Sequence, residues 1–356
     1  MTAPVITAWS AVSPFGLGRK TFADGVAAGV SAVTRPEEWP VPRQRVAPVP
    51  GFVTAEVLGR KGTRSMDRVS ALTAAAADEL LGADSRRRDV AAGERAALVL
   101  GTTAGSSTSM MDITRDTHTR AMPFHIDTPR IPNAIMNSSA AQCAIRHNLK
   151  GPNTTVAGGR AAGLFALRYA LRLLSFGHAR SVLCGGAEEL THDRGWLEHQ
   201  AGHPERPTAL GEGCSLLLLE PAAPPDGPVL AEVLGVTLGV FRDGERDAAL
   251  SDCLSRALSR AGVEAADLWA LSPAVGQGEV HIDGRSPLRL PGEEAWGDAG
   301  AAAAPFQIAS VLAAAEQDPA APGRVAAVLS ADRDNVHGCA LFRIAGQPAR
   351  IAKQPK

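Results

Sequence analysis

Apolar residues along this chain fall into short runs and longer alanine- and leucine-rich runs, and the two kinds alternate through the sequence. The short runs are bounded by glycine and proline and predict strands at residues 5–10, 96–100, 154–156, 181–184, 215–220, 229–237, 268–271, 325–330 and 339–344. The longer runs have helical spacing and predict helices at residues 21–28, 67–81, 161–175, 248–261 and 305–316. This alternation predicts an α/β protein with layered, mixed sheets.

One proline-rich stretch interrupts the alternation at residues 222–228 and marks the best boundary between two parts of the chain. The sequence therefore predicts an N-terminal half at residues 1–224, a C-terminal half at 225–346 and a tail at 347–356. Residues 276–295 are polar and interrupted by glycine and proline, which favours a loop.

The stretch around residues 154–163 has a distinctive local pattern. A β-branched run is followed by Gly158-Gly159 and then by a long apolar helix, which is the shape of a nucleophile elbow. The position after the two glycines is Arg160, however, and a guanidinium stays protonated and has no lone pair to offer. The elbow is recognisable, but its nucleophile is missing.

Charge and composition exclude several classes of function. The chain has 36 basic and 37 acidic residues, so no overall charge points to nucleic acid or to a membrane surface. It lacks a signal-peptide pattern and any apolar run near the ~20 residues of a membrane span, which predicts a cytoplasmic protein. The five cysteines and nine histidines have no ligand spacing, so we expect no disulfide framework, no metal and no cofactor.

Several motifs in order resemble the β-ketoacyl synthases of the thiolase-like superfamily. They are the turn Ser13-Pro14-Phe15-Gly16, the helix entry Met66-Asp67-Arg68, the pair Gly151-Pro152 and the strand entry Gly211-Glu212-Gly213. The resemblance covers roughly residues 3 to 345. It implies a thiolase-like α/β fold, layered α-β-α-β-α, with two similar halves and mixed sheets.

A working synthase of this family has a Cys-His-His site, in which cysteine takes the acyl chain and the histidines assist decarboxylation of the extender. The resemblance places Arg160 at the cysteine, Val275 at the first histidine and Asp298 at the second. Neither an arginine nor an acid can do the work of a neutral imidazole. We expect Arg160 to pair with Asp298 or Glu188; the alternative is a guanidinium that points into water.

Loss of all three positions within a retained fold resembles the chain length factor, the ketosynthase-like β subunit of type II polyketide synthases. The segment Ala302-Ala303-Ala304-Pro305 is also similar to this group, and the divergence indicates a polyene or other highly reducing system. Chain length factors of aromatic systems typically have glutamine where this chain has Arg160, so the priming role of that glutamine is not carried over. The resemblance implies an obligate heterodimer with a catalytic β-ketoacyl synthase, whose tunnel holds a chain borne by acyl carrier protein.

Matched to that family, three residues fall at the positions that measure chain length: Ser107, Met110 and Thr114. Their spacing of i, i+3 and i+7 puts them on one helix face. The alternative is that residues 103–111 form an ordinary polar loop that leads to a helix.

The resemblance also implies the interface with the synthase. The expected contact residues come from a helix and a strand before the elbow: Met136, Asn137, Gln142, Asn153, Thr154, Thr155 and Val156. The alternative is a simple core helix and core strand.

Two other functions remain open at this point. The scaffold could catalyse acyl transfer or hydrolysis through another nucleophile such as Cys214 or Ser138, although the sequence places no base near either. It could also be a purely structural stabiliser of a synthase that never touches the acyl chain.

Overall fold

The computed structural model describes residues 3–36, 45–82, 84–201, 209–221, 227–274, 276–277 and 286–346. Its strands are β1 Val5–Ser13, β2 Gly16–Leu17, β3 Val46–Ala47, β4 Ala96–Thr102, β5 Asn153–Ala157, β6 Ser181–Glu188, β7 Leu210–Gly211, β8 Gly213–Glu220, β9 Ala231–Val240, β10 Leu268–Ser272, β11 Leu288–Arg289, β12 Val325–Ala331 and β13 Val336–Ile344. Its α-helices are α1 Arg19–Ala28, α2 Thr54–Val57, α3 Arg68–Gly82, α4 Ser85–Val90, α5 Ser107–Thr119, α6 Ser138–His147, α7 Ala162–Ser175, α8 His192–Gln200, α9 Arg246–Ala261, α10 Glu293–Trp296 and α11 Ala303–Gln317. Short 3-10 helices are η1 Thr128–Ala134, η2 Gly159–Ala161, η3 Ala265–Asp267 and η4 Gly300–Ala302.

The main sheet consists of two five-stranded parts with one and the same topology. In the first part the order is β5-β4-β6-β8-β1, and in the second it is β11-β10-β12-β13-β9. If the strands on this path are counted along the chain within each half, both orders read 3-2-4-5-1. Both parts also share the same strand directions. In each order the first three strands are parallel to one another, and the last two pairings are antiparallel. The expected two similar halves are confirmed.

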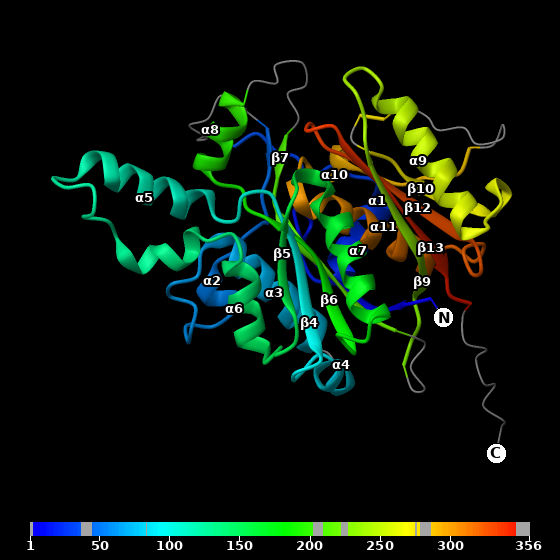
Figure 1. Cartoon of the computed structure of the whole chain (residues 1–356), viewed down its shortest axis with the longest axis horizontal. Helices are drawn as coiled ribbons and strands as arrows, with labels where there is room; N and C mark the ends of the chain where they lie inside the picture. Colours follow the sequence, from blue (N-terminus) through cyan, green and yellow to red (C-terminus); the bar gives the residue numbers. More distant parts are fainter. Residues whose placement is uncertain are drawn as a thin grey trace.

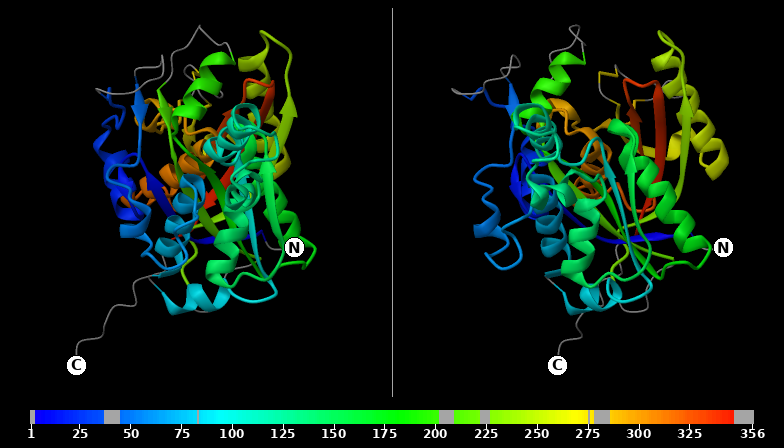
Figure 2. Two further views of the ribbon diagram at one scale, coloured as in Figure 1. Left: turned by 90° about the vertical axis from the view of Figure 1, so that its left-hand side faces the viewer. Right: turned by 60° about the vertical axis from the view of Figure 1, so that its left-hand side comes forward.

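The two parts meet at β1 and β9, where Val5 lies opposite Glu232 and Ile6 lies opposite Ala231. Helices α7 and α11 pack against each other between the two parts, and α3 and α9 cover the outer faces. A large cluster of buried apolar side chains fills this middle layer, which includes Leu164, Leu167 and Phe306. The order of layers is therefore α-β-α-β-α, as expected, and it can be followed in Figures 1 and 2.

Most predicted helices and strands are present, and their ends have local causes. Asp67 caps α3, because its carboxylate accepts a hydrogen bond from the amide of Ser70 at 2.8 Å. The helix ends at Gly82, one residue beyond the predicted range. The helix after the elbow begins at Ala162 and is preceded by η2.

Two predictions about irregular segments need comment. The loop expected at residues 276–295 is wrong in part, because β11 and α10 both lie within it, and β11 pairs with β10 through backbone hydrogen bonds that a side-chain pattern does not reveal. The boundary between residues 224 and 225 and the tail at 347–356 lie outside the described residues, so both stay predictions.

Helix α5 and the turn η1 form an arm that projects from the body of the molecule (Figure 1). The arm leaves the edge of the first half near β4 and returns to it before α6. Its two segments pack against each other, whereas beyond its first turn α5 touches the body mainly at α8.

Candidate functional site

The elbow is built where β5 ends and α7 begins. Gly159 has a φ of +56°, a backbone conformation that favours glycine. A β-carbon at Gly159 would also collide with the carboxylate of Asp332, in the turn between β12 and β13. The turn therefore needs glycine both for its conformation and for the approach of the second half, and it presents Arg160 at the contact between the halves.

Arg160 forms an ion pair with Asp298 through two nitrogens. Its Nε lies 3.1 Å from Oδ1 of Asp298, and its Nη2 contacts Oδ2. A third nitrogen lies 3.6 Å from Asp332. The side chain of Arg160 is 15% exposed and that of Asp298 is 2% exposed. The expected pairing is confirmed with Asp298, and the alternative of a guanidinium in water is wrong.

Glu188, the other expected partner, has its own contact, since it accepts a hydrogen bond from the amide of Ala301 at 3.2 Å. Its carboxyl lies at the end of β6 and is 1% exposed. Burial raises its pKa, although the nearby Arg194 guanidinium opposes that effect.

The charges around Asp298 favour its ionised form. Burial alone would raise its pKa, but the guanidinium groups of Arg160 and Arg194 lower it to about 2. Burial would lower the pKa of Arg160, yet Asp298 raises it well above its ordinary value. Arg194 is itself buried and donates to the backbone oxygens of Glu189, Gly211 and Asp298. The charged pair is thus held in a site where each member has a partner.

A pocket of about 310 Å³ opens over this pair. Its described lining comprises Thr103, Ala157, Gly158, Gly159, Arg160, Glu198, Asp298, Gly300, Asp332, Arg333 and Asp334. No histidine, cysteine or lysine is among these lining residues. Val275, matched to the first histidine, lies outside the residues that the structure describes. The described part of the pocket offers charge recognition, but it has neither the thiol nor the imidazole groups that condensation uses.

Neither alternative nucleophile has a base beside it in the described structure. Cys214 lies in β8 and is fully buried, and burial raises the pKa of its thiol, so a thiolate is disfavoured. Ser138 is buried at the start of α6, where its hydroxyl accepts a hydrogen bond from the Gln142 amide at 2.9 Å. Within the part of the chain that the structure describes, no hydrogen bond joins either group to a histidine.

The three residues matched to chain-length positions all lie on α5. Ser107 is buried, Met110 is partly buried and Thr114 is exposed. The hydroxyl of Thr114 donates to the carbonyl of Met110 at 2.9 Å. The alternative of a polar loop is wrong from residue 107 onward, because the helix begins there after the cap Ser106. Contact of these side chains with an acyl chain stays a prediction.

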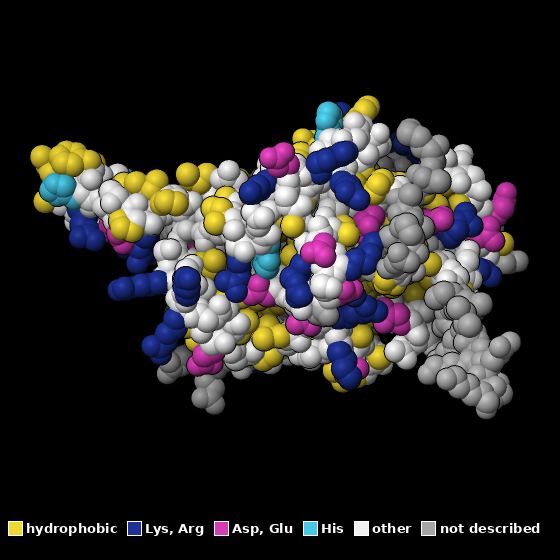
Figure 3. Space-filling model, turned by 90° about the horizontal axis from the view of Figure 1, so that it is seen from below, with side chains coloured by type: hydrophobic (Ala, Val, Ile, Leu, Met, Phe, Trp, Pro, Cys, Tyr) yellow, Lys and Arg dark blue, Asp and Glu magenta, His cyan; other side chains and the backbone are white. Residues whose placement is uncertain are grey.

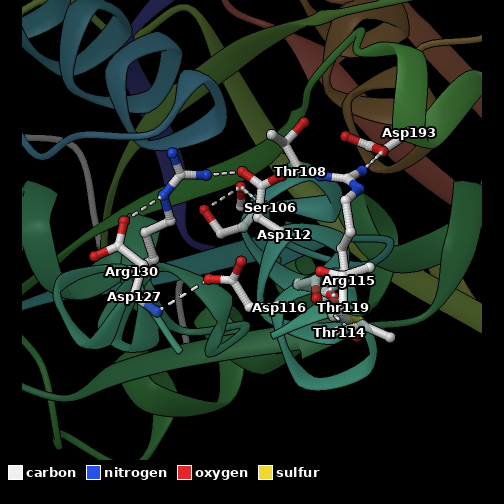
Figure 4. A network of polar contacts seen from close by, with 12 residues as sticks. Ser106, Thr108, Asp112, Thr114, Arg115, Asp116, Thr119, Asp127, Arg130 and Asp193 are labelled. Carbon is white, nitrogen blue, oxygen red and sulfur yellow. Dashed lines mark hydrogen bonds and ion pairs between the residues drawn. The ribbon is translucent and has the colours of Figure 1, made fainter. Parts of the chain in front are cut away.

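A network of charges holds the arm in shape, as Figure 4 shows. Asp112 contacts both Arg115 and Arg130, and Arg130 also lies 3.0 Å from Asp127. The amide of Asp127 donates to Asp116 at 3.1 Å. These contacts join α5 to the segment that returns along it, so the arm has a defined shape although it projects from the core.

The tip of the arm has exposed apolar side chains. Phe124 is 70% exposed and Met122 is also exposed. In Figure 3 apolar side chains gather on this projecting end, with basic side chains beside them. Exposed apolar surface of this kind is typical of a binding surface.

The expected interface residues lie at the edge of the first half. Strand β5 is the last strand in its part of the sheet, and among the described residues it pairs with β4 alone. Met136 and Asn137 are exposed before α6, whereas the amide of Gln142 donates to Asn133 at 2.9 Å. The alternative of a buried core strand does not fit β5, whose residues are all exposed or partly exposed. Their contact with another subunit stays a prediction.

Sequence reasoning missed several residues around these sites. Asp332 and Arg194 support the Arg160–Asp298 pair, and Ile145, 81% exposed on α6, adds apolar surface beside the predicted interface. Arg194 and Ile145 gave no signal, because their roles depend on burial and exposure.

Comparison with family models finds a match to "Beta-ketoacyl synthase, N-terminal domain" over residues 3–238. Among curated relatives, the 3-oxoacyl-[acyl-carrier-protein] synthase 2 of Vibrio cholerae is 23% identical over 240 residues, covering 61% of this chain and 57% of the relative. The "Putative polyketide beta-ketoacyl synthase 2" of Streptomyces virginiae is 30% identical over 197 residues, covering 53% and 47%. The chain spans about half the length of the curated relatives it matches.

Among solved structures, "The ishigamide ketosynthase/chain length factor" superimposes with a TM-score of 0.89 and 44% identity, over 97% of this chain and 100% of that one. The complex described as "AntDE:AntF (apo): type II PKS acyl-carrier protein in complex with its ketosynthase bound to the hexaketide" matches with a TM-score of 0.76 and 18% identity, over 97% of this chain and 100% of that one, which supports the fold alone. These matches confirm the thiolase-like ketosynthase fold.

Two features are absent from the described residues. No helix there is long and apolar enough to cross a membrane. No group of three or more histidine, cysteine, aspartate or glutamate side chains in the same part of the chain is arranged to hold a metal ion. The cytoplasmic location stays a prediction.

Proposed function

Because this chain belongs to the β-ketoacyl synthase family, we propose that it is a chain length factor, the non-catalytic partner of a β-ketoacyl synthase in a type II polyketide synthase. The two subunits form a heterodimer, and the synthase performs decarboxylative Claisen condensation on chains borne by acyl carrier protein. The 44% identity with the ishigamide ketosynthase/chain length factor over nearly the whole chain supports this assignment.

The Arg160–Asp298 ion pair is the observation that carries the proposal. Condensation needs a nucleophile that accepts the acyl chain and neutral groups that assist decarboxylation. At the elbow this chain has a guanidinium in contact with a buried carboxylate, in place of a thiol beside an imidazole. Such a pair stabilises the fold and cannot form a thioester, so the cysteine that carries the chain belongs to the partner.

The gate is helix α5. A tunnel closed by a rigid wall limits chain length by excluded volume. Ser107 and Thr114 are small, and the flexible side chain of Met110 lies between them on the same helix face. We assign the floor of the tunnel to Met110.

The heterodimer forms through the edge of the first half. Strand β5, with its predicted contacts Asn153, Thr154, Thr155 and Val156, offers a free edge for pairing. Met136, Asn137 and Gln142 flank that edge. Helix α5 projects from the body of the chain (Figure 1), and in the proposed heterodimer this projection extends toward the partner.

Co-expression with a candidate synthase tests the proposal. We expect a one-to-one complex to co-purify, and we expect Met110→Trp to shorten the products and Met110→Ala to lengthen them, as measured by mass spectrometry. Product length is the decisive readout, because the volume of a side chain at the floor changes it directly.

Other outcomes would favour the alternatives. Unchanged product lengths from a well-formed heterodimer would indicate a purely structural stabiliser. Consumption of malonyl- or acyl-carrier substrate by the chain without a partner would indicate an acyltransferase or hydrolase. A stable homodimer that takes up no synthase would argue against the whole proposal.

A further inference from the structure

The first turn of α5 rests on a buried carboxyl that the proposed function leaves without a role. Glu189 follows the last residue of β6 and is 1% exposed. Its Oε1 accepts a hydrogen bond from the amide of Thr108 at 3.4 Å. The hydroxyl of Ser106 accepts one from the amide of Ser109 at 3.3 Å. Together the two acceptors bind amides that a helix start leaves unpaired.

The direction of α5 is set at this base. From residue 111 onward every residue of the helix is partly or fully exposed. In this stretch the side chain of Arg115 contacts Asp193 of α8, at 3.5 Å. Both of those side chains are reached by water, so their ion pair restrains the helix weakly. A small change at the first turn is amplified along a helix that projects from the body (Figure 1).

The contact with Glu189 is chemically specific. Burial raises the pKa of Glu189 to about 8, and the carboxyls of Asp67 and Glu188 add to the rise. A neutral carboxyl in this place accepts the hydrogen bond from Thr108 without a counter-ion. An amide of the same shape can accept the same bond, whereas an alkyl side chain cannot.

We propose that Glu189 is a positioning residue for the gate: its hydrogen bond to the first turn of α5 sets the direction in which Ser107, Met110 and Thr114 face the acyl chain. The inference rests on the proposed function. A change of side-chain volume at Met110 either shortens or lengthens the products. Loss of the Glu189 contact instead lets the axis of α5 adopt more than one orientation. The expected signature of the second change is a broader distribution of lengths on both sides of the native product.

The test uses the heterodimer with its synthase and three variants. Glu189→Leu removes the acceptor and Glu189→Gln keeps it. Glu220→Gln is the matched control, because Glu220 is also a buried carboxyl next to a strand end and pairs with Arg86, away from α5. Product lengths are measured by mass spectrometry, and the protection of residues 107–110 is measured by amide hydrogen exchange.

We expect Glu189→Leu to broaden the product distribution and to speed exchange in the first turn by roughly tenfold, the factor that loss of one helix cap gives. Glu189→Gln and Glu220→Gln should stay close to the wild type. Where Glu189→Leu does not assemble, Thr108→Pro removes the same hydrogen bond from the donor side, at a position in the first turn where proline is tolerated. It should broaden the products in the same way.

An unchanged distribution with Glu189→Leu or Thr108→Pro would overturn the inference, and so would equal broadening with Glu220→Gln. Met110→Trp in the same experiment separates this failure from failure of the proposed function. If Met110→Trp shortens the products while Glu189→Leu changes nothing, the gate stands and its positioning by Glu189 does not.

Discussion

At the scale of single residues, the elbow has kept its backbone and changed its chemistry. Gly159 still makes the turn that delivers the next side chain to the contact between the halves. Arg160 lies there on the first half, and Asp298 and Asp332 face it from the second. A site of this geometry joins two parts of the fold by charge.

A double-mutant cycle on this pair tests that role. Arg160→Met leaves the buried Asp298 carboxylate without its main partner and should lower the free energy of unfolding by about 3–5 kcal/mol. Adding Asp298→Asn removes the orphaned charge, so the double variant should be more stable than Arg160→Met alone. Urea denaturation of the purified complexes measures both effects. Simple additivity of the two substitutions would show that the pair is not coupled.

The same pair predicts the acid behaviour of the protein. The pKa of Asp298 is lowered in the folded state to about 2, below its ordinary value of 3.8. The stabilisation from its ionised form is therefore complete above the ordinary value and is lost as the pH falls toward the lowered one. In the cycle above, the difference between wild type and Asp298→Asn should shrink over that interval.

At the scale of elements, β5 is an edge strand, and no other described strand pairs with its outward amides. The amide of Leu98 donates to Pro152 and the amide of Gly158 donates to Thr102, so even-numbered residues of this strand bond to β4. Because alternate residues of a strand face opposite neighbours, Thr155 directs its amide away from β4. A substitution at Thr155 can therefore remove a donor from the predicted interface without removing a hydrogen bond of the sheet.

Thr155→Pro should weaken co-purification with the synthase, because it removes one outward donor and leaves the bonds to β4 in place. Thr155→Val is the matched control, since it keeps the amide and the branched shape. Pull-down of the synthase by the tagged chain measures the effect, and thermal unfolding of the chain checks that it still folds. Equal recovery of the synthase with both variants would place the interface elsewhere.

At the scale of the whole molecule, two halves with the same topology pack against each other through their central helices, α7 and α11. A β-carbon at Gly163 on α7 would collide with the ring of Pro305 on α11. A β-carbon at Gly186 in β6 would collide with the backbone oxygen of Ala301. The closest approach of the halves therefore depends on glycine in the same region as the Arg160–Asp298 pair.

Gly163→Val should push α7 from α11 and destabilise the protein by about 1–3 kcal/mol, the usual cost of overpacking a core. Gly82→Ala is the control, because Gly82 ends α3 with open space around it and should change stability by less than about 1 kcal/mol. Chemical denaturation compares the two variants. An equal loss at both sites would mean that helix contact between the halves is not the cause.

The sequence by itself determined the layers and the absence of a nucleophile at the elbow. Buried strands and helices can be predicted from the spacing of their apolar residues, because burial of one face or of a whole element imposes a local pattern. Capping residues such as Asp67 mark the ends of helices. Motifs that keep order and spacing were enough to match Arg160 and Asp298 to catalytic positions. A guanidinium excludes nucleophilic chemistry wherever it lies.

Only the tertiary structure decided which residues touch. It brought Asp298 and Asp332 to Arg160 across more than a hundred positions of sequence, and it showed β5 at a free edge. It also put Glu189 beneath the first turn of α5 and made α5 part of a projecting arm. Pairing, burial and exposure arise from the packing of distant segments, so a local pattern of residues does not contain them.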